Sequence, residues 1–223
     1  MWQKLCAWIK SNMEDPNKNM IETDDEVYYG VGSFLWEVAK VFLWALVIIV
    51  PIRIFLFQPF FVQGASMEPN FKDGDYLVVN EFGYKITNVL DDFGMPHVFT
   101  VGAFREFSRG DVAVFRYPKD VTQFFIKRII GLPGETVKVE GGKVTIFNNQ
   151  NPDGLVLDEH AYLPAGLVTN GALTIVLKSD EYFTLGDNRP FSHDSRAWGV
   201  LPEKDVVGKV LVRAWPLSKA EIL

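Results

Sequence analysis

A hydrophobic run at residues 38–57 constrains this chain more than any other part of its sequence. The run reads VAKVFLWALVIIVPIRIFLF, and Lys40 and Arg53 are its only charged residues. A helix of about twenty apolar residues crosses the roughly 30 Å hydrocarbon layer of a bilayer. Only twelve residues separate the two cations, so a span requires both side chains to snorkel toward opposite headgroup layers. We predict a transmembrane helix at residues 38–57. The alternative is a buried core helix kinked by Pro51.

The chain on either side of this run differs in character. Residues 1–37 are largely mixed and polar and are predicted to form an N-terminal tail. A cleavable leader fits poorly, because Gln58 and Pro59 follow the run where a small-residue cleavage site would stand. Lys and Arg are sparse on both flanks, so the positive-inside bias leaves the orientation open.

After residue 60 the pattern changes to short alternating runs. Examples are residues 111–115, 143–147 and 209–213, which are separated by clusters of Gly, Pro and Asn. A period of two is typical of strands that bury one face. We therefore predict a mostly β fold in which residues 58–223 form one domain of ordinary size.

The composition argues against several partners and cofactors. A formal net charge of −6 is the wrong sign for a phosphate-backbone partner. Cys6 is the only cysteine, and His97, His160 and His193 lack the close spacing of zinc ligands. We expect no nucleic-acid partner, no metal and no cofactor.

Two separate phrases supply a candidate nucleophile and a candidate base. Residues 64–69 read Gly-Ala-Ser-Met-Glu-Pro, a turn that can expose Ser66 and aim backbone N–H groups at an oxyanion. Lys127 lies in a predicted strand, where alternation puts Phe125 on its own face and Arg128 on the other. To accept a proton near neutrality, the lysine pKa must fall from about 10.4 to near 7, which apolar burial can cause. The alternatives are an ordinary turn serine and a surface lysine on an edge strand.

A third phrase, at residues 186–199, is dense in hydroxyls and carboxylates. It reads GDNRPFSHDSRAWG. Asp194 and Arg196 are two residues apart and can pair to hold the loop, while Ser192 or Ser195 can hydrogen-bond a neutral lysine. The alternative is an ordinary solvated turn.

These phrases resemble the bacterial type I signal peptidase family, also called leader peptidases. The matching residues are Ser66-Met67-x-Pro69, Lys127-Arg128 with Gly131-Leu132-Pro133-Gly134, and Gly186-Asp187-Asn188-x5-Asp194-Ser195-Arg196. Residues 110–115 and the hydrophobic run also match, so the resemblance covers about residues 41–213. It implies a signal-peptidase-like β-sheet catalytic body with an N-terminal transmembrane helix.

The resemblance implies a Ser/Lys catalytic dyad. Ser66 attacks the scissile carbonyl, and Lys127, as a neutral amine, takes the serine proton. Ser192 corresponds to the family serine that orients the lysine. The Ser66 backbone N–H forms part of the oxyanion hole, whereas Gly64 occupies the position at which the family often supplies a second donor from a serine hydroxyl.

The resemblance also implies substrates and a location. Secreted preproteins would be cut after small residues, at Ala-x-Ala type sites, by a monomer on the outer face of the cytoplasmic membrane, in contact with lipid. The loop is held by Asp187, Asp194 and Arg196. The substrate-binding residues are Phe60, Val62, Gln63, Met67, Phe125 and Ile126.

Three other readings compete with this one. A self-cleaving Ser/Lys repressor would carry a DNA-binding helical module and a less acidic balance. A signal peptidase of the endoplasmic reticulum type would use histidine as its base, yet Lys127 stands at that position and His193 reads as a loop residue. A catalytically silent peptide-binding scaffold would not depend on Ser66 or Lys127.

Overall fold

In a computed structural model of the chain, residues 31–55, 57–88 and 100–223 are described. The chain divides into two units, Met1–Ile48 and Ile49–Leu223. Most of the predicted N-terminal tail, residues 1–30, lies outside the described residues.

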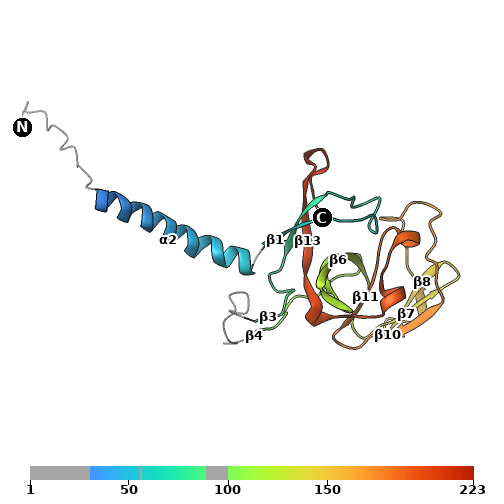
Figure 1. Cartoon of the computed structure of the whole chain (residues 1–223). Coiled ribbons are helices and arrows are strands. Elements are labelled where there is room, and N and C mark those ends of the chain that lie inside the picture. Colours follow the sequence, from blue (N-terminus) through green and yellow to red (C-terminus); the bar gives the residue numbers. More distant parts are fainter. Residues whose placement is uncertain (1–30, 56, 89–99) are drawn as a thin grey trace, which may run out of the picture. The chain divides into compact units, whose positions relative to one another are not determined.

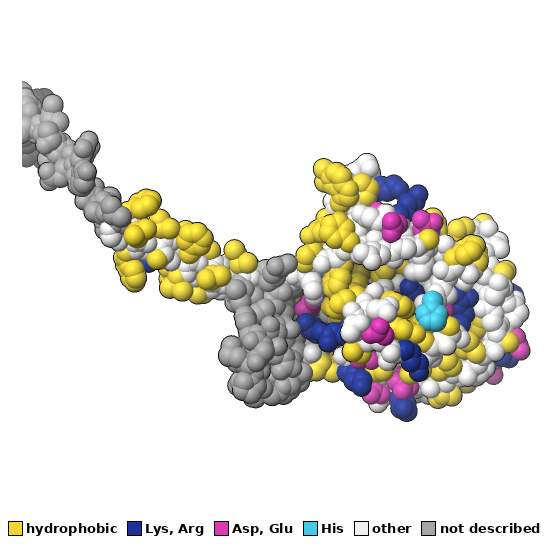
Figure 2. All heavy atoms as spheres, viewed as in Figure 1, with side chains coloured by type: hydrophobic (Ala, Val, Ile, Leu, Met, Phe, Trp, Pro, Cys, Tyr) yellow, Lys and Arg dark blue, Asp and Glu magenta, His cyan; other side chains and the backbone are white. Residues whose placement is uncertain are grey.

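Residues 38–55 of the predicted hydrophobic span lie in one helix, α2 (Val31–Phe55), whereas Phe57, the last residue of that prediction, is the first residue of strand β1 (Phe57–Phe61). Large apolar side chains are exposed along it, including Phe34, Trp44 and Ile49, and hydrophobic atoms cover most of α2 in the view of Figure 2. Across the described residues, the structure contains no helix with the length and apolar character that a membrane crossing requires. Residue 56 of the predicted span lies outside that described part.

Beyond α2, the described residues are mostly β-sheet, as the alternating runs predicted (Figure 1). The strands are β1 (Phe57–Phe61), β2 (Tyr76–Asn80), β3 (Thr87–Asn88), β4 (Thr100–Val101), β5 (Val112–Tyr117), β6 (Asp120–Gly131), β7 (Thr136–Glu140), β8 (Lys143–Asn148), β9 (Asn151–Val156), β10 (Leu173–Val176), β11 (Glu181–Leu185), β12 (Leu201–Pro202), β13 (Val206–Trp215) and β14 (Glu221–Ile222). The short helices are η2 (Arg189–Phe191), α3 (Ser195–Trp198), η3 (Glu203–Asp205) and η4 (Leu217–Lys219).

The strands form two main sheets in the described part of the chain. The larger has the order β1-β2-β13-β5-β6-β11-β12, with β14 added beside β13, and the smaller has the order β10-β7-β8-β9. Within the smaller sheet β7 and β8 are antiparallel, and their buried valines and isoleucine face one another across the pair, Val137 opposite Ile146 and Val139 opposite Val144. Such cross-strand pairs explain why the alternating runs in the sequence form strands.

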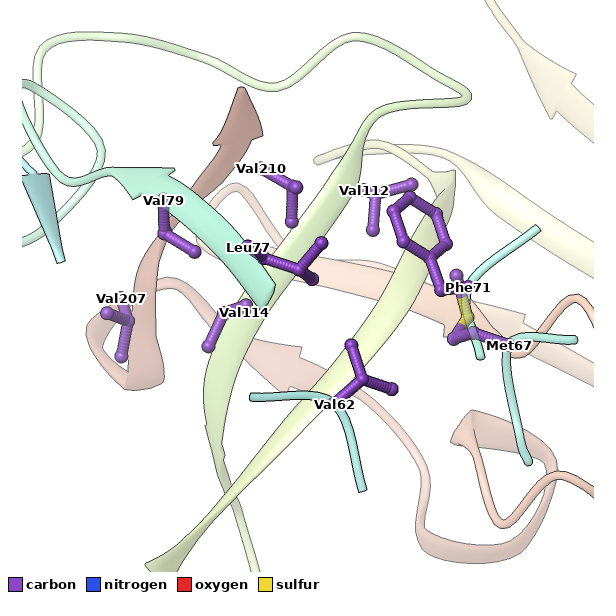
Figure 3. Packing of buried hydrophobic residues seen from close by; sticks show 9 residues of the cluster. All are labelled: Val62, Met67, Phe71, Leu77, Val79, Val112, Val114, Val207 and Val210. Atoms are coloured by element: carbon purple, nitrogen blue, oxygen red, sulfur yellow. The ribbon is translucent and has the colours of Figure 1, made fainter. Parts of the chain in front are cut away.

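One core cluster supports the segment that follows β1. Its buried side chains come from β2, β5, β13 and residues 62–71 (Figure 3). Met67 and Phe71 lie side by side at one end of this cluster and are almost completely buried. The segment after β1 is therefore attached to the sheet by its apolar side chains, which leaves its polar residues free to face outward.

Two of the open strand edges in the larger sheet belong to β1 and β6. Among the described residues, β1 lies at one end of the strand order and pairs only with β2. β11 pairs with β6 at Arg128, Ile129 and Gly131, so residues 120–127 have no strand on that side among those described. Unpaired edges of this kind can accept an added peptide strand.

Candidate active site

The turn that carries Ser66 is fixed on both sides of the serine. On one side, the Gly64 N–H donates to Asp73 Oδ1 (2.7 Å), and Gly64 has a φ of +86°, a backbone conformation that favours glycine. On the other, the Phe71 N–H donates to the Met67 carbonyl (2.9 Å). Ser66 itself is half-buried, so its hydroxyl is held in place and still reachable.

Lys127 contacts Ser66 directly. Its Nζ donates to Ser66 Oγ (2.7 Å) and to the Ile126 carbonyl (2.8 Å). The lysine stands opposite the fully buried Ala113 in the β5–β6 pair, and its Nζ lies 5.3 Å from the centre of the Phe125 ring, on the face that alternation predicted. Two residues that are 61 positions apart in sequence are thus brought within hydrogen-bond distance.

The surroundings of Lys127 favour its neutral form. The side chain is 4% exposed, and this burial lowers the pKa of Lys127 to about 8, against the opposing effect of the Asp194 and Asp187 carboxylates. At pH 8 about half of the lysine is then a neutral amine. A neutral amine 2.7 Å from a hydroxyl is within the range from which a general base takes a proton.

Ion pairs hold the loop at residues 186–199 against β6. Arg128 binds Asp187 with two parallel hydrogen bonds, Nε to Oδ1 (2.8 Å) and Nη2 to Oδ2 (2.6 Å). Asp194 pairs with Arg196 (2.8 Å) and also accepts from the Gly186 N–H (3.0 Å). Both aspartates are fully buried. Their carboxylates are occupied by these partners, which fits a role in holding the loop.

Among the described residues, neither loop serine is hydrogen-bonded to Lys127. Ser192 Oγ is buried and has no hydrogen-bond partner among the described residues. Ser195 Oγ accepts from the Thr184 N–H (3.1 Å). An orienting role for Ser192 therefore stays a prediction.

A cavity of about 670 Å³ opens beside Ser66 and Lys127, between β1 and β6. The predicted substrate-binding residues that line it are Phe60, Val62, Gln63, Phe125 and Ile126. Met67 is not among the residues that line this cavity: it is 0% exposed and belongs to the core cluster, so its predicted place beside the substrate stays a prediction. Leu77, Phe124, Phe191 and His193 also line the cavity, without having been predicted to do so.

His193 is an exposed residue that makes a different contact. Its Nε2 lies 3.1 Å from the Tyr117 hydroxyl, whereas the group hydrogen-bonded to Ser66 Oγ is Lys127. Within the described residues, no group of three or more His, Cys, Asp or Glu side chains is arranged to hold a metal ion.

Comparison with known proteins shows the family of this chain. The family described as "Signal peptidase, peptidase S26" matches residues 35–215. This chain belongs to the signal peptidase family. It is therefore a serine endopeptidase, and the removal of signal peptides is the activity that its relatives support.

Two bacterial signal peptidases are similar to this chain. Signal peptidase I of Pseudomonas fluorescens is 32% identical over 83% of this chain and 75% of its own length. Signal peptidase IB of Staphylococcus aureus is 31% identical over 78% of this chain and 86% of its own length. A crystal structure of a signal peptidase I from Enterococcus faecalis V583 is 29% identical and covers 47% of this chain and 97% of that chain, with a TM-score of 0.38.

Gly186 offers a test of how closely the loop of this signal peptidase packs on Ser66. A Cβ at position 186 would lie 2.4 Å from the Ser66 carbonyl oxygen and 2.1 Å from Ser192 Oγ, so the Ser66 turn would have to shift. We expect Gly186→Ala to lower kcat by roughly 100-fold, since a displacement of about 1 Å at a catalytic group has that effect. Gly102→Ala is the matched control, because no atom lies within 4 Å of its added Cβ. Equal preprotein cleavage by the two variants would contradict this packing argument.

Proposed function

We propose that this enzyme removes signal peptides from exported preproteins, with Ser66 as nucleophile and Lys127 as general base, at Ala-x-Ala type sites. The observation that carries the proposal is the 2.7 Å contact between Lys127 Nζ and Ser66 Oγ beside a substrate-sized cavity. The lowered pKa of Lys127 supports it, because a lysine base must be neutral before it can accept a proton.

The dyad accounts for both halves of the reaction. As Ser66 Oγ bonds to the scissile carbonyl carbon, its proton moves to Lys127 and the carbonyl oxygen becomes an anion. The resulting ammonium returns the proton to the leaving amine as the peptide bond breaks, which leaves an acyl-enzyme and a neutral lysine. A water then attacks the ester carbonyl carbon and gives a proton to Lys127, and as the ester bond breaks the lysine returns that proton to Ser66 Oγ, which releases the signal peptide with a new C-terminal carboxyl group.

Substrate would bind as an extended strand between the open edges of β1 and β6. Both edges have unpaired backbone groups on the side of the cavity, and backbone pairing gives affinity without sequence preference. Selectivity for small residues would come from the apolar wall beside Ser66. That wall includes Phe60 and Ile126, which pack against the core cluster, and Val62, which belongs to the cluster and is 5% exposed.

Cleavage-site selectivity can be measured on a purified preprotein with an Ala-x-Ala site. The full-length enzyme in detergent should release one product, and N-terminal sequencing should put the cut directly after the second alanine. Changing that alanine to phenylalanine should abolish cleavage. Equal cleavage of both substrates would contradict small-residue selectivity while leaving the dyad untouched.

We also propose that residues 38–57 anchor the enzyme in the cytoplasmic membrane, with the β body on its outer face. The apolar sequence of α2 supports an anchor, since a helix that is apolar all round needs an apolar environment. In cells, the full chain should stay in the membrane pellet at alkaline pH, and external protease should reach the β body of spheroplasts. Release into the alkaline supernatant would contradict anchoring.

A further inference from the structure

Asn188, in the loop at residues 186–199, contacts the turn that carries Ser66, here called the nucleophile turn. The Nδ2 of Asn188 donates to the Ala65 carbonyl (2.9 Å), and the Asn188 backbone N–H donates to the Ser66 carbonyl (3.1 Å). The neighbours of Asn188 are buried and paired: Asp187 binds Arg128, and Arg189 is ion-paired as well. Asn188 is therefore held in place by both flanking residues while it donates hydrogen bonds to the carbonyls of Ala65 and Ser66.

The contact has a defined donor. A peptide carbonyl can only accept, so the group of Asn188 that faces Ala65 must be its NH₂. The Ala65 carbonyl also accepts from the Glu68 N–H, at the longer distance of 3.2 Å. Both lone pairs of this oxygen are thus used, and the shorter of its two bonds comes from Asn188.

Fixing the Ala65 carbonyl also fixes the Ser66 N–H. The two groups belong to the same planar peptide unit and point in opposite directions, so the carbonyl cannot rotate without turning the N–H. Ser66 N–H donates to no carbonyl or side chain in the described part of the chain. Gly64 has no side chain with which to supply a second donor. The direction of the Ser66 N–H therefore affects how well a developing oxyanion is stabilised.

We propose that Asn188 is a positioning residue that aims the Ser66 N–H at the oxyanion. Its side-chain amide holds the peptide between Ala65 and Ser66 in orientation, and a hydrogen bond to the carbonyl polarises that peptide, which makes its N–H a better donor. This inference rests on the proposed function of Ser66. It concerns the transition state rather than substrate binding, because the oxyanion forms only as Ser66 attacks.

The test compares Asn188→Ala and Asn188→Asp in the full-length enzyme, with a peptide that spans an Ala-x-Ala site. Both variants keep the backbone bond to Ser66 and lose the donor to Ala65. We expect kcat to fall by roughly tenfold to 100-fold, somewhat less than the 10²–10³ seen when an oxyanion donor is deleted, with KM changed less than twofold. Asn188→Asp has the same size as the wild type and puts an acceptor against the carbonyl, so its loss should be at least as large.

Three controls separate this role from a general effect on folding. Asn148→Ala removes an amide that binds Glu135 in the smaller sheet and should lower thermal stability without the loss in kcat. The pH dependence of kcat/KM should keep its midpoint in Asn188→Ala, since Lys127 is untouched. A peptide aldehyde, whose hemiacetal oxygen occupies the oxyanion position, should bind the variant tenfold to 100-fold more weakly.

Wild-type kcat and aldehyde affinity in both Asn188 variants would overturn the inference. So would a rise in KM with kcat unchanged, because that pattern indicates substrate binding. If Ser66→Ala still cleaves the peptide, the proposed function itself fails. Activity that depends on Ser66 but not on Asn188 overturns only the positioning role.

Discussion

Replacing Lys127 with methionine is expected to reduce preprotein cleavage by at least about 10⁴-fold, because no other group is hydrogen-bonded to Ser66 Oγ in the described structure. Ser66→Ala should cause a loss of similar size. Residues that act as one unit are not additive, so the double variant should be no slower than either single variant. Initial rates of cleavage in detergent measure all three effects.

Lys127→Met should leave the fold intact and change how the free energy of unfolding depends on pH. The pKa of Lys127 is about 8 in the folded protein and about 10.4 in an unfolded chain, so the unfolded state binds more protons between these values. Wild-type stability should therefore rise from pH 8 to pH 10. Relative to wild type, Lys127→Met should be most stable near pH 7 and lose that advantage by pH 10. If the melting temperatures of Lys127→Met and the wild type differed by the same amount at every pH, the argument that burial destabilises the Lys127 ammonium would be contradicted.

The second large effect is expected from Asp187→Ala, which removes the partner of Arg128. The Arg128 side chain is 11% exposed and Asp187 is 0% exposed, so the variant leaves a guanidinium buried without its counter-charge. Breaking a buried pair in this way costs about 3–5 kcal/mol of unfolding free energy. Cleavage should fall as well, because Arg128 adjoins Lys127 on β6. Urea denaturation at pH 7 measures the change in stability.

An exposed pair provides the matched control for this prediction. Lys138 and Glu140 are 40% and 65% exposed and lie 2.5 Å apart, and surface pairs contribute only about 0–1 kcal/mol. Glu140→Ala should therefore unfold close to wild type. If Asp187→Ala and Glu140→Ala were equally stable, the claim that the Arg128–Asp187 pair holds the loop would be contradicted.

The β body and the position of Lys127 were predictable because both depend on local pattern. Alternation marks strands, and within β6 it separates the lysine from Arg128, which turns away to bind Asp187. The burial of Met67 was not predictable in the same way. A methionine beside a candidate nucleophile can face the cavity or the core, and the packing of Phe71 and the strands beneath decides this.

Contacts between distant segments were the least predictable part of the site. The family resemblance linked Ser66 with Lys127 across 61 positions. Nothing in the spacing of Asn188 links it to Ala65, which is 123 positions away. The fold joins them because the buried pair of Arg128 and Asp187 pulls the loop onto β6, beside the nucleophile turn.

The most direct test of the dyad is the pH dependence of kcat/KM for the full-length enzyme, which reports groups of the free enzyme. If neutral Lys127 is the base, the rate should rise about tenfold per pH unit below pH 8 and level off above it. His193→Ala should keep this profile. A rise centred near the ordinary histidine pKa of about 6.5, lost in His193→Ala, would contradict the Ser66–Lys127 assignment.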